Sequence, residues 1–144
     1  KAIQGLREAR KIMEMEVTTS AEELAPNLSS LAGAVLAARL ISRAGGLRRL
    51  AGMPGSRVQV MGAEKSLFKH LKGHAPSPKH GIIYRHPAVI GSPKRLRGKV
   101  SRALAGKLAI AARLDFYGAG RSMDLLSSLD IRLDDIKRRG RKKP

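Results

Sequence analysis

Residues 97–115, RGKVSRALAGKLAIAARLD, carry the pattern that decides the fold. At 100° per residue, they predict one long amphipathic helix that begins near Pro93 and ends at about Asp115. The side of this helix that should be buried comprises Leu96, Val100, Ala103, Leu104, Leu108, Ala111 and Leu114. The opposite side forms a narrow basic stripe, with Gly106 among its members: Arg95, Lys99, Arg102 and Arg113. Such a helix packs one side into a core and presents positive charge on the other.

Helical patterns extend outward from this stretch in both directions. Residues 2–24 predict a mixed-charge helical arm with a sparse apolar face, which the Thr-Thr-Ser cluster at 18–20 could interrupt. A second helix is expected over 27–44, with Asn27 as its N-cap and Gly45 as its stop. The remaining helices are predicted over 47–51, from 63 to about 71, and over 122–137, where a flexible basic tail follows.

Two segments are not typical of helices. Residues 57–61, RVQVM, resemble a strand but are too short and isolated to imply a sheet. Residues 72–81 are expected to be a loop that two prolines stiffen. We therefore predict an all-α fold that has a helical arm over 1–25, a compact helical domain over 26–120, and a helix with a basic tail over 121–144.

The charge of the chain is large and unevenly distributed. Twenty-nine Lys and Arg against eleven Asp and Glu give a formal net charge of +18. Between Leu24 and Leu114 there is a single acid, Glu64, among seventeen bases. Such a field disfavours the compact state unless a polyanion binds, so the composition predicts a nucleic acid or an anionic membrane as partner. No apolar run approaches the ~20 residues that span a bilayer.

Residue types that support catalysis are scarce. The chain has no cysteine, and the basic region offers one glutamate and four histidines. His70 and His74 have a spacing that could place two zinc ligands on one helix face, but Gly73 lies between them and no carboxylate is near in sequence. We therefore expect no enzymatic activity, no cofactor and no metal site.

Two basic features are candidates for RNA contact. The stripe of the long helix contains no acid for nearly five turns, which favours phosphate contact by Lys99, Arg102 and Arg113 over a merely solvated face. The loop PSPKHG, residues 76–81, carries Lys79 and His80. This loop is either an ordinary surface turn, or a stiff loop that offers a cation to phosphate and a flat ring to an unpaired base.

The third candidate is GAEK, residues 62–65. We expect Gly62 at a helix N-cap, Glu64 at the second position and Lys65 at the third. Glu64 there could simply gain about 0.3–1 kcal/mol from the helix dipole. Alternatively, because Gly62 has no Cβ, a phosphate or ribose could approach the free N–H groups of the helix. Lys65 would then add charge, and Glu64 would either orient Lys65 or accept a hydrogen bond from a base.

Four segments together resemble the Nop domain family, which comprises the core scaffold proteins of box C/D ribonucleoproteins and a related spliceosomal protein. The resemblance covers about residues 24–118. The segments are APNLSSLAGAVLAARLISRAGGLRRLAGMP (25–54), GAEKSLFKHL (62–71), PKHGIIYRHP (78–87) and RGKVSRALAGKLAIAARLD (97–115).

This resemblance implies an all-helical module that recognises a kink-turn RNA already bound by a small kink-turn-binding protein of ribosomal type. It places Gly62, Ala63, Glu64 and Lys65 at the RNA surface, and brings the Lys79–His80 loop and the basic side of the long helix toward RNA. The chain would be an RNP-assembly module that holds box C/D guide RNA for 2′-O-methylation. The alternative is a general basic nucleic-acid-binding protein, of ribosomal or DNA-compacting type.

The resemblance also implies partners beyond RNA. Full-length family members carry an N-terminal domain that binds the methyltransferase fibrillarin, and a coiled coil through which they dimerise. Residues 1–25 resemble the end of that coiled coil, so we expect the chain to be a fragment whose fibrillarin-binding part lies elsewhere. The expected location is the cytoplasm of an archaeal cell, or the nucleolus or nucleus if the protein is eukaryotic.

Overall fold

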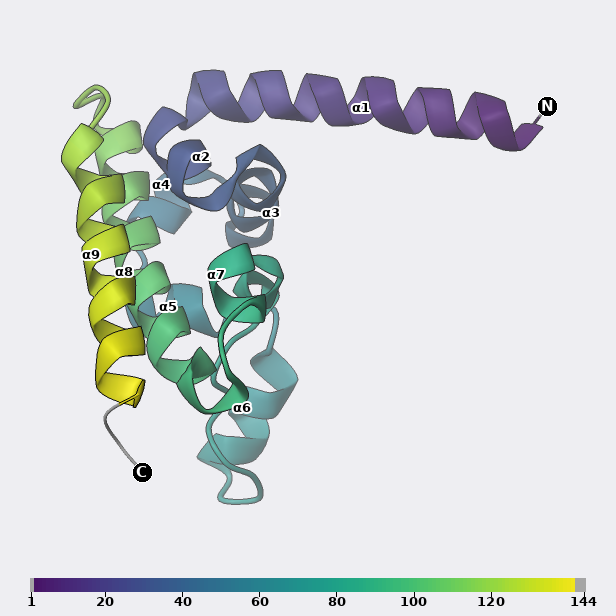
Figure 1. The fold of residues 1–144 in the computed structure, drawn as a ribbon. Coiled ribbons are helices and arrows are strands. Elements are labelled where there is room, and N and C mark those ends of the chain that lie inside the picture. Colours follow the sequence, from purple (N-terminus) through teal and green to yellow (C-terminus); the bar gives the residue numbers. More distant parts are fainter. Residues whose placement is uncertain (1, 142–144) are drawn as a thin grey trace.

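A computed structural model describes residues 2–141, and all the regular elements in this range are helices (Figure 1). The all-α prediction is therefore confirmed. The elements are α1 (Ala2–Leu24), α2 (Pro26–Ala32), α3 (Ala34–Ala44), α4 (Leu47–Ala51), α5 (Gly55–Gln59), α6 (Glu64–Leu71), η1 (Ile82–Arg85), α7 (Pro87–Ile90), η2 (Lys94–Leu96), α8 (Arg97–Phe116) and α9 (Met123–Arg141). Within the described range, no helix is both long enough and apolar enough to cross a membrane.

Helix α8 is the centre of the fold, since α2, α4, α5 and α9 all pack against it. The predicted apolar side is inside, with Val100 and Leu104 fully buried and only Ala103 and Leu114 half-buried. The buried surface is wider than predicted because neighbours cover α8 on several sides, and it also includes Ser101, Ala105, Ala109 and Ala112. The expected start at Pro93 is wrong: Pro93 is extended, with ψ of 143°, and a short 3-10 turn precedes α8.

The strand-like segment 57–61 is in fact largely helical, because α5 covers Gly55–Gln59. Its Val58 is fully buried, and packing against α8 overrides the β-propensity of the segment. The two helices touch at glycines, since a Cβ added to Gly55 would lie 3.0 Å from the Cα of Gly106. This contact requires glycine at position 55, since a Cβ added to Gly106 itself would meet no atom within 4 Å.

The single helix expected over 27–44 is also wrong, because Gly33, with φ of 82°, divides it into α2 and α3. Asn27 is not the N-cap, since it lies within the first turn of α2 after Pro26. Its buried side chain instead donates to Asp115 Oδ1 at 2.9 Å and to the Gly120 carbonyl at 2.8 Å. Asp115 also accepts from the backbone N–H groups of Asn27 and Leu28, at 3.0 and 2.8 Å, and so caps α2 from the end of α8.

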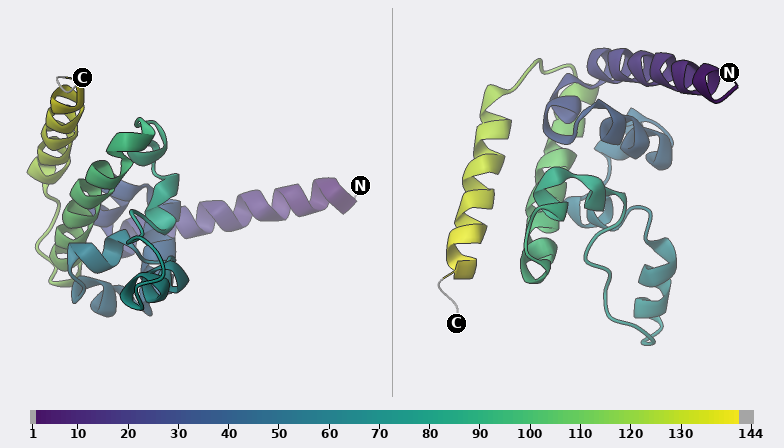
Figure 2. Two further views of the ribbon diagram at one scale, coloured as in Figure 1. Left: turned by 90° about the horizontal axis from the view of Figure 1, so that it is seen from below. Right: turned by 45° about the vertical axis from the view of Figure 1, so that its right-hand side comes forward.

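The two ends of the chain differ in how they meet this core. Helix α1 projects from the body as an uninterrupted arm (Figure 1), and Thr18 and Thr19 return hydrogen bonds to carbonyls one turn earlier instead of breaking it. Helix α9 lies alongside α8 in the views of Figures 1 and 2 and continues to Arg141. The tail expected after Lys137 is thus helical as far as Arg141, and its last three residues, 142–144, lie outside the described residues.

Contacts with the start of α8 explain why α9 extends so far. Arg95 Nη1 donates to the Gly140 carbonyl at 2.7 Å, and Gly140 is buried against the Leu96 side chain. These contacts connect residues distant in sequence, so the basic composition of the segment alone did not indicate them. The loop predicted over 72–81 is confirmed.

Candidate nucleic-acid interface

The GAEK segment forms the start of α6, one residue later than expected. Ala63 is the N-cap and Glu64 the first helical residue, while Gly62 precedes them with φ of 92°. The N–H of Gly62 donates to Glu64 Oε1 at 3.1 Å, and Arg43 Nη2 lies 3.3 Å from Glu64 Oε2. The protein itself therefore supplies partners to both oxygens of the lone carboxylate, and the cation it pairs with is Arg43 of α3.

These partners also set the charge state of Glu64. The hydrogen bond from the Gly62 N–H, followed by that from its own backbone N–H and by the nearby Arg43, lowers the pKa of Glu64 below its usual value of 4.5. Glu64 is thus ionised at neutral pH. Sequence reasoning missed Arg43 because it lies on another helix, 21 residues upstream.

Backbone hydrogen bonds hold the Lys79–His80 loop against the turn that leads to GAEK. Gly81 donates to the Gln59 carbonyl at 2.9 Å and Ile82 donates to the Met61 carbonyl at 2.8 Å. The Gln59 side chain donates to the Lys79 carbonyl at 2.7 Å. The loop is therefore a fixed part of the surface beside Gly62, as the second of the two interpretations of PSPKHG requires.

Two glycines make this close approach possible. A Cβ added to Gly81 would overlap the Met61 carbonyl oxygen, and one added to Gly62 would lie 2.6 Å from Ile82 Cγ2. The position of Gly62 therefore has no room for a Cβ. Its positive φ is a second reason why glycine is favoured there. The glycine of GAEK has a clear packing role as well as any role in ligand access.

His80 is part of a stacked group that the sequence did not indicate. Its ring centroid lies 4.6 Å from that of Tyr84, and the Arg97 guanidinium carbon lies over the Tyr84 ring, 5.4 Å from its centroid. Partial burial lowers the pKa of His80, and the positive charges of Arg97 and Lys79 lower it further. The half-buried imidazole is consequently neutral at pH 7 and is held in a defined orientation.

Lys65 and Lys79 are both exposed. In the part of the chain that the structure describes, neither Lys65 nor Lys79 forms an ion pair. The methylenes of Lys79 lie beside Gly98, because a Cβ built on Gly98 would approach them to 3.6–3.8 Å. The side chain of Lys79 thus lies beside the first turn of α8.

The basic stripe of α8 divides between two places. Lys99 and Arg102 are exposed and line a groove between α8 and α9. Arg113 instead donates from Nε to the Ala51 carbonyl at 3.2 Å and from Nη2 to the Met53 carbonyl at 3.1 Å. These bonds give Arg113 a structural role at the end of α4, so we leave it out of the proposed RNA surface.

A second groove, of about 720 Å³, borders GAEK between α3, α5 and α6. Its walls combine the charged side chains of Arg43, Arg57 and Glu64 with apolar Leu67 and Phe68. No residue of α6 is buried, and Phe68 is 63% exposed. A helix that buries nothing in its own domain is available to a partner.

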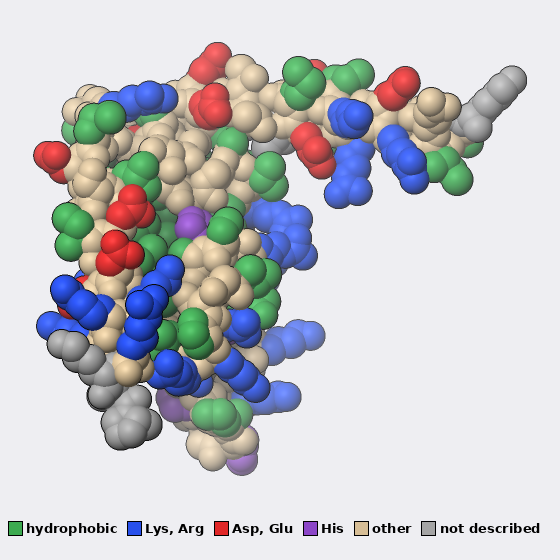
Figure 3. Space-filling model, viewed as in Figure 1, with side chains coloured by type: hydrophobic (Ala, Val, Ile, Leu, Met, Phe, Trp, Pro, Cys, Tyr) green, Lys and Arg blue, Asp and Glu red, His purple; other side chains and the backbone are tan. Residues whose placement is uncertain are grey.

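The histidines do not gather into a metal site. His70 Nδ1 lies 3.1 Å from the Ala75 carbonyl. Among residues 2–141, no three or more His, Cys, Asp or Glu lie close enough together to hold a metal ion. Figure 3 shows many Lys and Arg over the lower half of the molecule and others along α1, whereas acids lie mostly over α1 and the upper part of α9.

Comparison with known families identifies these elements. A sequence model of the Nop family, described as "snoRNA binding domain, fibrillarin", matches residues 1–135. The chain belongs to the Nop family. An uncharacterised NOP5 family protein of Methanocaldococcus jannaschii is 51% identical over 95% of this chain and 33% of its own length. Nucleolar protein 56 of Dictyostelium discoideum is 42% identical over 78% of this chain and 21% of its own length.

A solved structure agrees with the Nop assignment. A chain in the crystal structure of a fibrillarin/Nop5p complex is 39% identical, with a TM-score of 0.78, over 94% of this chain and 51% of that chain. The present Nop chain thus spans about a third of the length of the NOP5 family protein and about half of the solved chain.

Proposed function

We propose that this Nop chain is a non-catalytic assembly module that binds a box C/D-type kink-turn RNA together with its kink-turn-binding protein. It would hold guide RNA in place for 2′-O-methylation by a methyltransferase carried on another chain. One observation carries the proposal: hydrogen bonds hold the Lys79–His80 loop against residues 59–61, directly before GAEK, so that the exposed Lys65 and Lys79 belong to one surface. The description of the family as an snoRNA binding domain and the fibrillarin complex of a relative support it.

Each side chain of this surface has a role suited to its chemistry. Lys65 and Lys79 would contact phosphates, and the neutral ring of His80 would stack on an unpaired base. Glu64 is tolerated in this position because Gly62 and Arg43 already satisfy its carboxylate. It would act by fixing the turn, in place of the contact with a base considered from the sequence.

The exposed side of α6 supports a protein partner beside the RNA. Phe68 and Leu71 are 63% and 70% exposed, although both are large and apolar. They alternate with Lys65 and Lys69 on a helix that buries no residue in this domain. A surface that combines cations with exposed apolar groups suits a composite of RNA and protein better than RNA alone.

Helix α1 supports self-association. It projects from the body (Figure 1), and its exposed apolar side chains include Ile3, Leu6, Ile12, Met13 and Met15. We propose that this arm is the end of a coiled coil through which longer Nop proteins dimerise. Fibrillarin would bind to a part of those longer proteins outside the segment that matches this chain.

Gel shifts with a kink-turn RNA, with and without its kink-turn-binding protein, test the composite surface. We expect weak, salt-sensitive binding to free RNA and much tighter binding when that protein is present. Lys65→Ala should reduce the slope of log affinity against log salt by about 1, for one lost phosphate contact. Arg48→Ala, which removes an exposed cation of α4, is the matched control and should leave the complex unchanged.

Equal affinity with and without the kink-turn-binding protein would contradict the proposal. Competition with bulk duplex DNA separates it from the alternative of a general nucleic-acid-binding protein, because bulk DNA would then displace the RNA efficiently. Methyl transfer by this chain alone would contradict the non-catalytic role.

A further inference from the structure

The groove between α8 and α9 is lined by cations from both helices. Its volume is about 980 Å³. The cations that line it are Lys99, Arg102 and Lys107 of α8 and Arg132, Arg138 and Arg139 of α9. Among the described residues that line it, Asp135 is the only acid. None of these residues borders the groove beside GAEK, so the two surfaces are separate.

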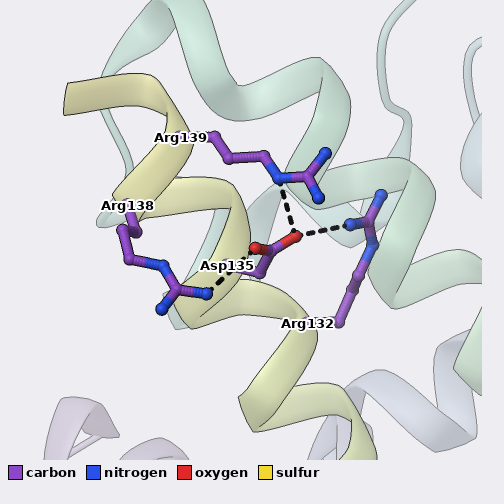
Figure 4. A network of polar contacts seen from close by, with 4 residues as sticks. All are labelled: Arg132, Asp135, Arg138 and Arg139. Atoms are coloured by element: carbon purple, nitrogen blue, oxygen red, sulfur yellow. Dashed lines mark hydrogen bonds and ion pairs between the residues drawn. The ribbon is translucent and has the colours of Figure 1, made fainter. Parts of the chain in front are cut away.

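Asp135 organises the three arginines of α9 (Figure 4). Its Oδ2 lies 3.0 Å from Arg132 Nη1 and 3.2 Å from Arg139 Nε, and its Oδ1 lies 3.2 Å from Arg138 Nη2. One carboxylate therefore fixes three guanidinium groups whose summed charge exceeds its own. Each guanidinium has five N–H donors, so most of them remain available to a ligand. The arginine side chains are 55–76% exposed.

Side-chain contacts hold the cations of α8 and those of α9 in fixed positions on the two sides of the groove. The Nζ of Lys107 donates to Ser128 Oγ at 2.8 Å across the groove. Arg95 binds the Gly140 carbonyl at its far end. A smaller depression there, lined by Arg95, Lys99 and Arg139, continues the cationic track. The groove is thus built by both helices, and these contacts join its two sides.

Gly106 leaves space in the groove. It lines the groove between Arg102 and Lys107, and a Cβ added to it would meet no atom within 4 Å. From Lys99 to Lys107 the track runs about 12 Å along α8. Over that distance, one strand of a nucleic-acid duplex presents about three or four phosphates.

We propose that the groove between α8 and α9 is a second RNA site, which binds the phosphodiester backbone without reading sequence. Its lining contains no Asn, Gln or aromatic side chain in the described part of the chain, so base recognition has no donor–acceptor pair or stacking platform there. Its arginines suit bidentate contact with phosphate. The inference extends the proposed function, since it assigns RNA flanking the kink-turn to a separate surface.

The test uses the full chain and a kink-turn RNA extended by flanking duplex. The groove variant is Arg132→Ala/Arg138→Ala/Arg139→Ala. Its control, Arg7→Ala/Lys11→Ala/Arg121→Ala, removes the same charge from exposed positions outside both grooves. We expect the groove variant to lower the salt slope by about 2–3 and the affinity about tenfold or more, and the control to do neither.

A second variant separates shape from charge. Gly106→Leu fills the groove without changing any charge and should weaken binding of the extended RNA severalfold, with the helical circular dichroism spectrum unchanged. Shortening the flanking duplex should abolish the effect of both groove variants. If the groove variants bind the extended RNA as tightly as the control, the inference is wrong.

The same titrations distinguish this inference from the proposed function. Groove variants should weaken binding by the same factor with and without the kink-turn-binding protein. Lys65→Ala should instead reduce the enhancement that this protein gives. If the kink-turn-binding protein does not enhance RNA binding by the unaltered chain, the proposed function is wrong. That result would leave the groove untouched, because the groove is tested by the effect of its own variants.

Discussion

The backbone N–H of Gly62 donates a 3.1 Å hydrogen bond to the carboxylate of Glu64, two residues further along the chain. Together with Arg43, this bond explains how the only acid between Leu24 and Leu114 persists in a basic field. The carboxylate closes the turn at the start of α6 and neutralises a cation from α3. The charge of Glu64 therefore stabilises the conformation of this surface. A nearby phosphate would approach a carboxylate that is already paired with Arg43.

Glu64→Gln should reduce the free energy of unfolding by less than about 1 kcal/mol, because the carboxylate is half exposed. The pKa of Glu64 is lowered in the folded state, so the unfolded state binds the proton more readily. The contribution of Glu64 to stability is therefore fully present above the usual pKa of 4.5. It is lost as the pH falls through the folded pKa. Urea unfolding from neutral to acid pH measures both effects, with Glu23→Gln on α1 as the exposed control.

The same variant tests the function. We expect Glu64→Gln to weaken the ternary complex with RNA and the kink-turn-binding protein while the fold stays intact, since Arg43 and the 62–64 turn lose their charged anchor. Unchanged ternary affinity would leave Glu64 with a role in helix capping only.

Gly62→Ala and Gly73→Ala form a matched pair for the packing of GAEK on Ile82. Both glycines have positive φ, at 92° and 80°, so each substitution incurs a similar backbone penalty of about 1 kcal/mol. Only at Gly62 would the new Cβ approach Ile82 Cγ2 to 2.6 Å, whereas it meets nothing within 4 Å at Gly73. We expect Gly62→Ala to lose about 1–3 kcal/mol more in chemical denaturation. Equal losses would mean that the loop does not rest on Gly62.

Asp115→Ala should be strongly destabilising, by about 2–4 kcal/mol, because it leaves N–H donors of Asn27 and Leu28 without their acceptor. The buried Asn27 side chain also joins the 117–122 loop, where it accepts from the Ser122 N–H at 2.7 Å. Asp130→Ala, on the exposed side of α9, should change stability by no more than about 0.5 kcal/mol. Thermal unfolding of the two variants side by side measures the difference.

His80 should give stability a pH dependence that His80→Gln removes. Burial lowers the folded pKa of His80 below its usual value of 6.5, so the unfolded state binds more protons. Stability is then highest above pH 6.5 and decreases as the pH falls from there toward the folded pKa. Unfolding curves collected across this range should show a smaller decrease for His80→Gln. An identical decrease in both proteins would assign it to another group.

Local pattern was sufficient for the features that depend on near neighbours. The period of 97–115 predicted the central helix and most of its buried side, and the glycines at 45–46 predicted the end of α3. The charge imbalance and the four motifs predicted the family. Burial of an apolar face, helix termination and net charge all follow from residues within a few turns of one another, so one sequence reveals them.

Only the tertiary structure decided where the polar and small residues act. Asn27 looked like a helix cap until Asp115 was seen to take that role from 88 residues away. Arg113 was assigned to a basic stripe from the sequence, but in the structure its guanidinium donates to the carbonyls of Ala51 and Met53 at the end of α4 and just beyond it. Arg138 and Arg139 looked like the start of a tail, but the bond from Arg95 to the Gly140 carbonyl extends α9 past them, and they line a groove. A hydrogen bond or ion pair depends on distance in space, and packing brings together residues that no spacing along the chain relates.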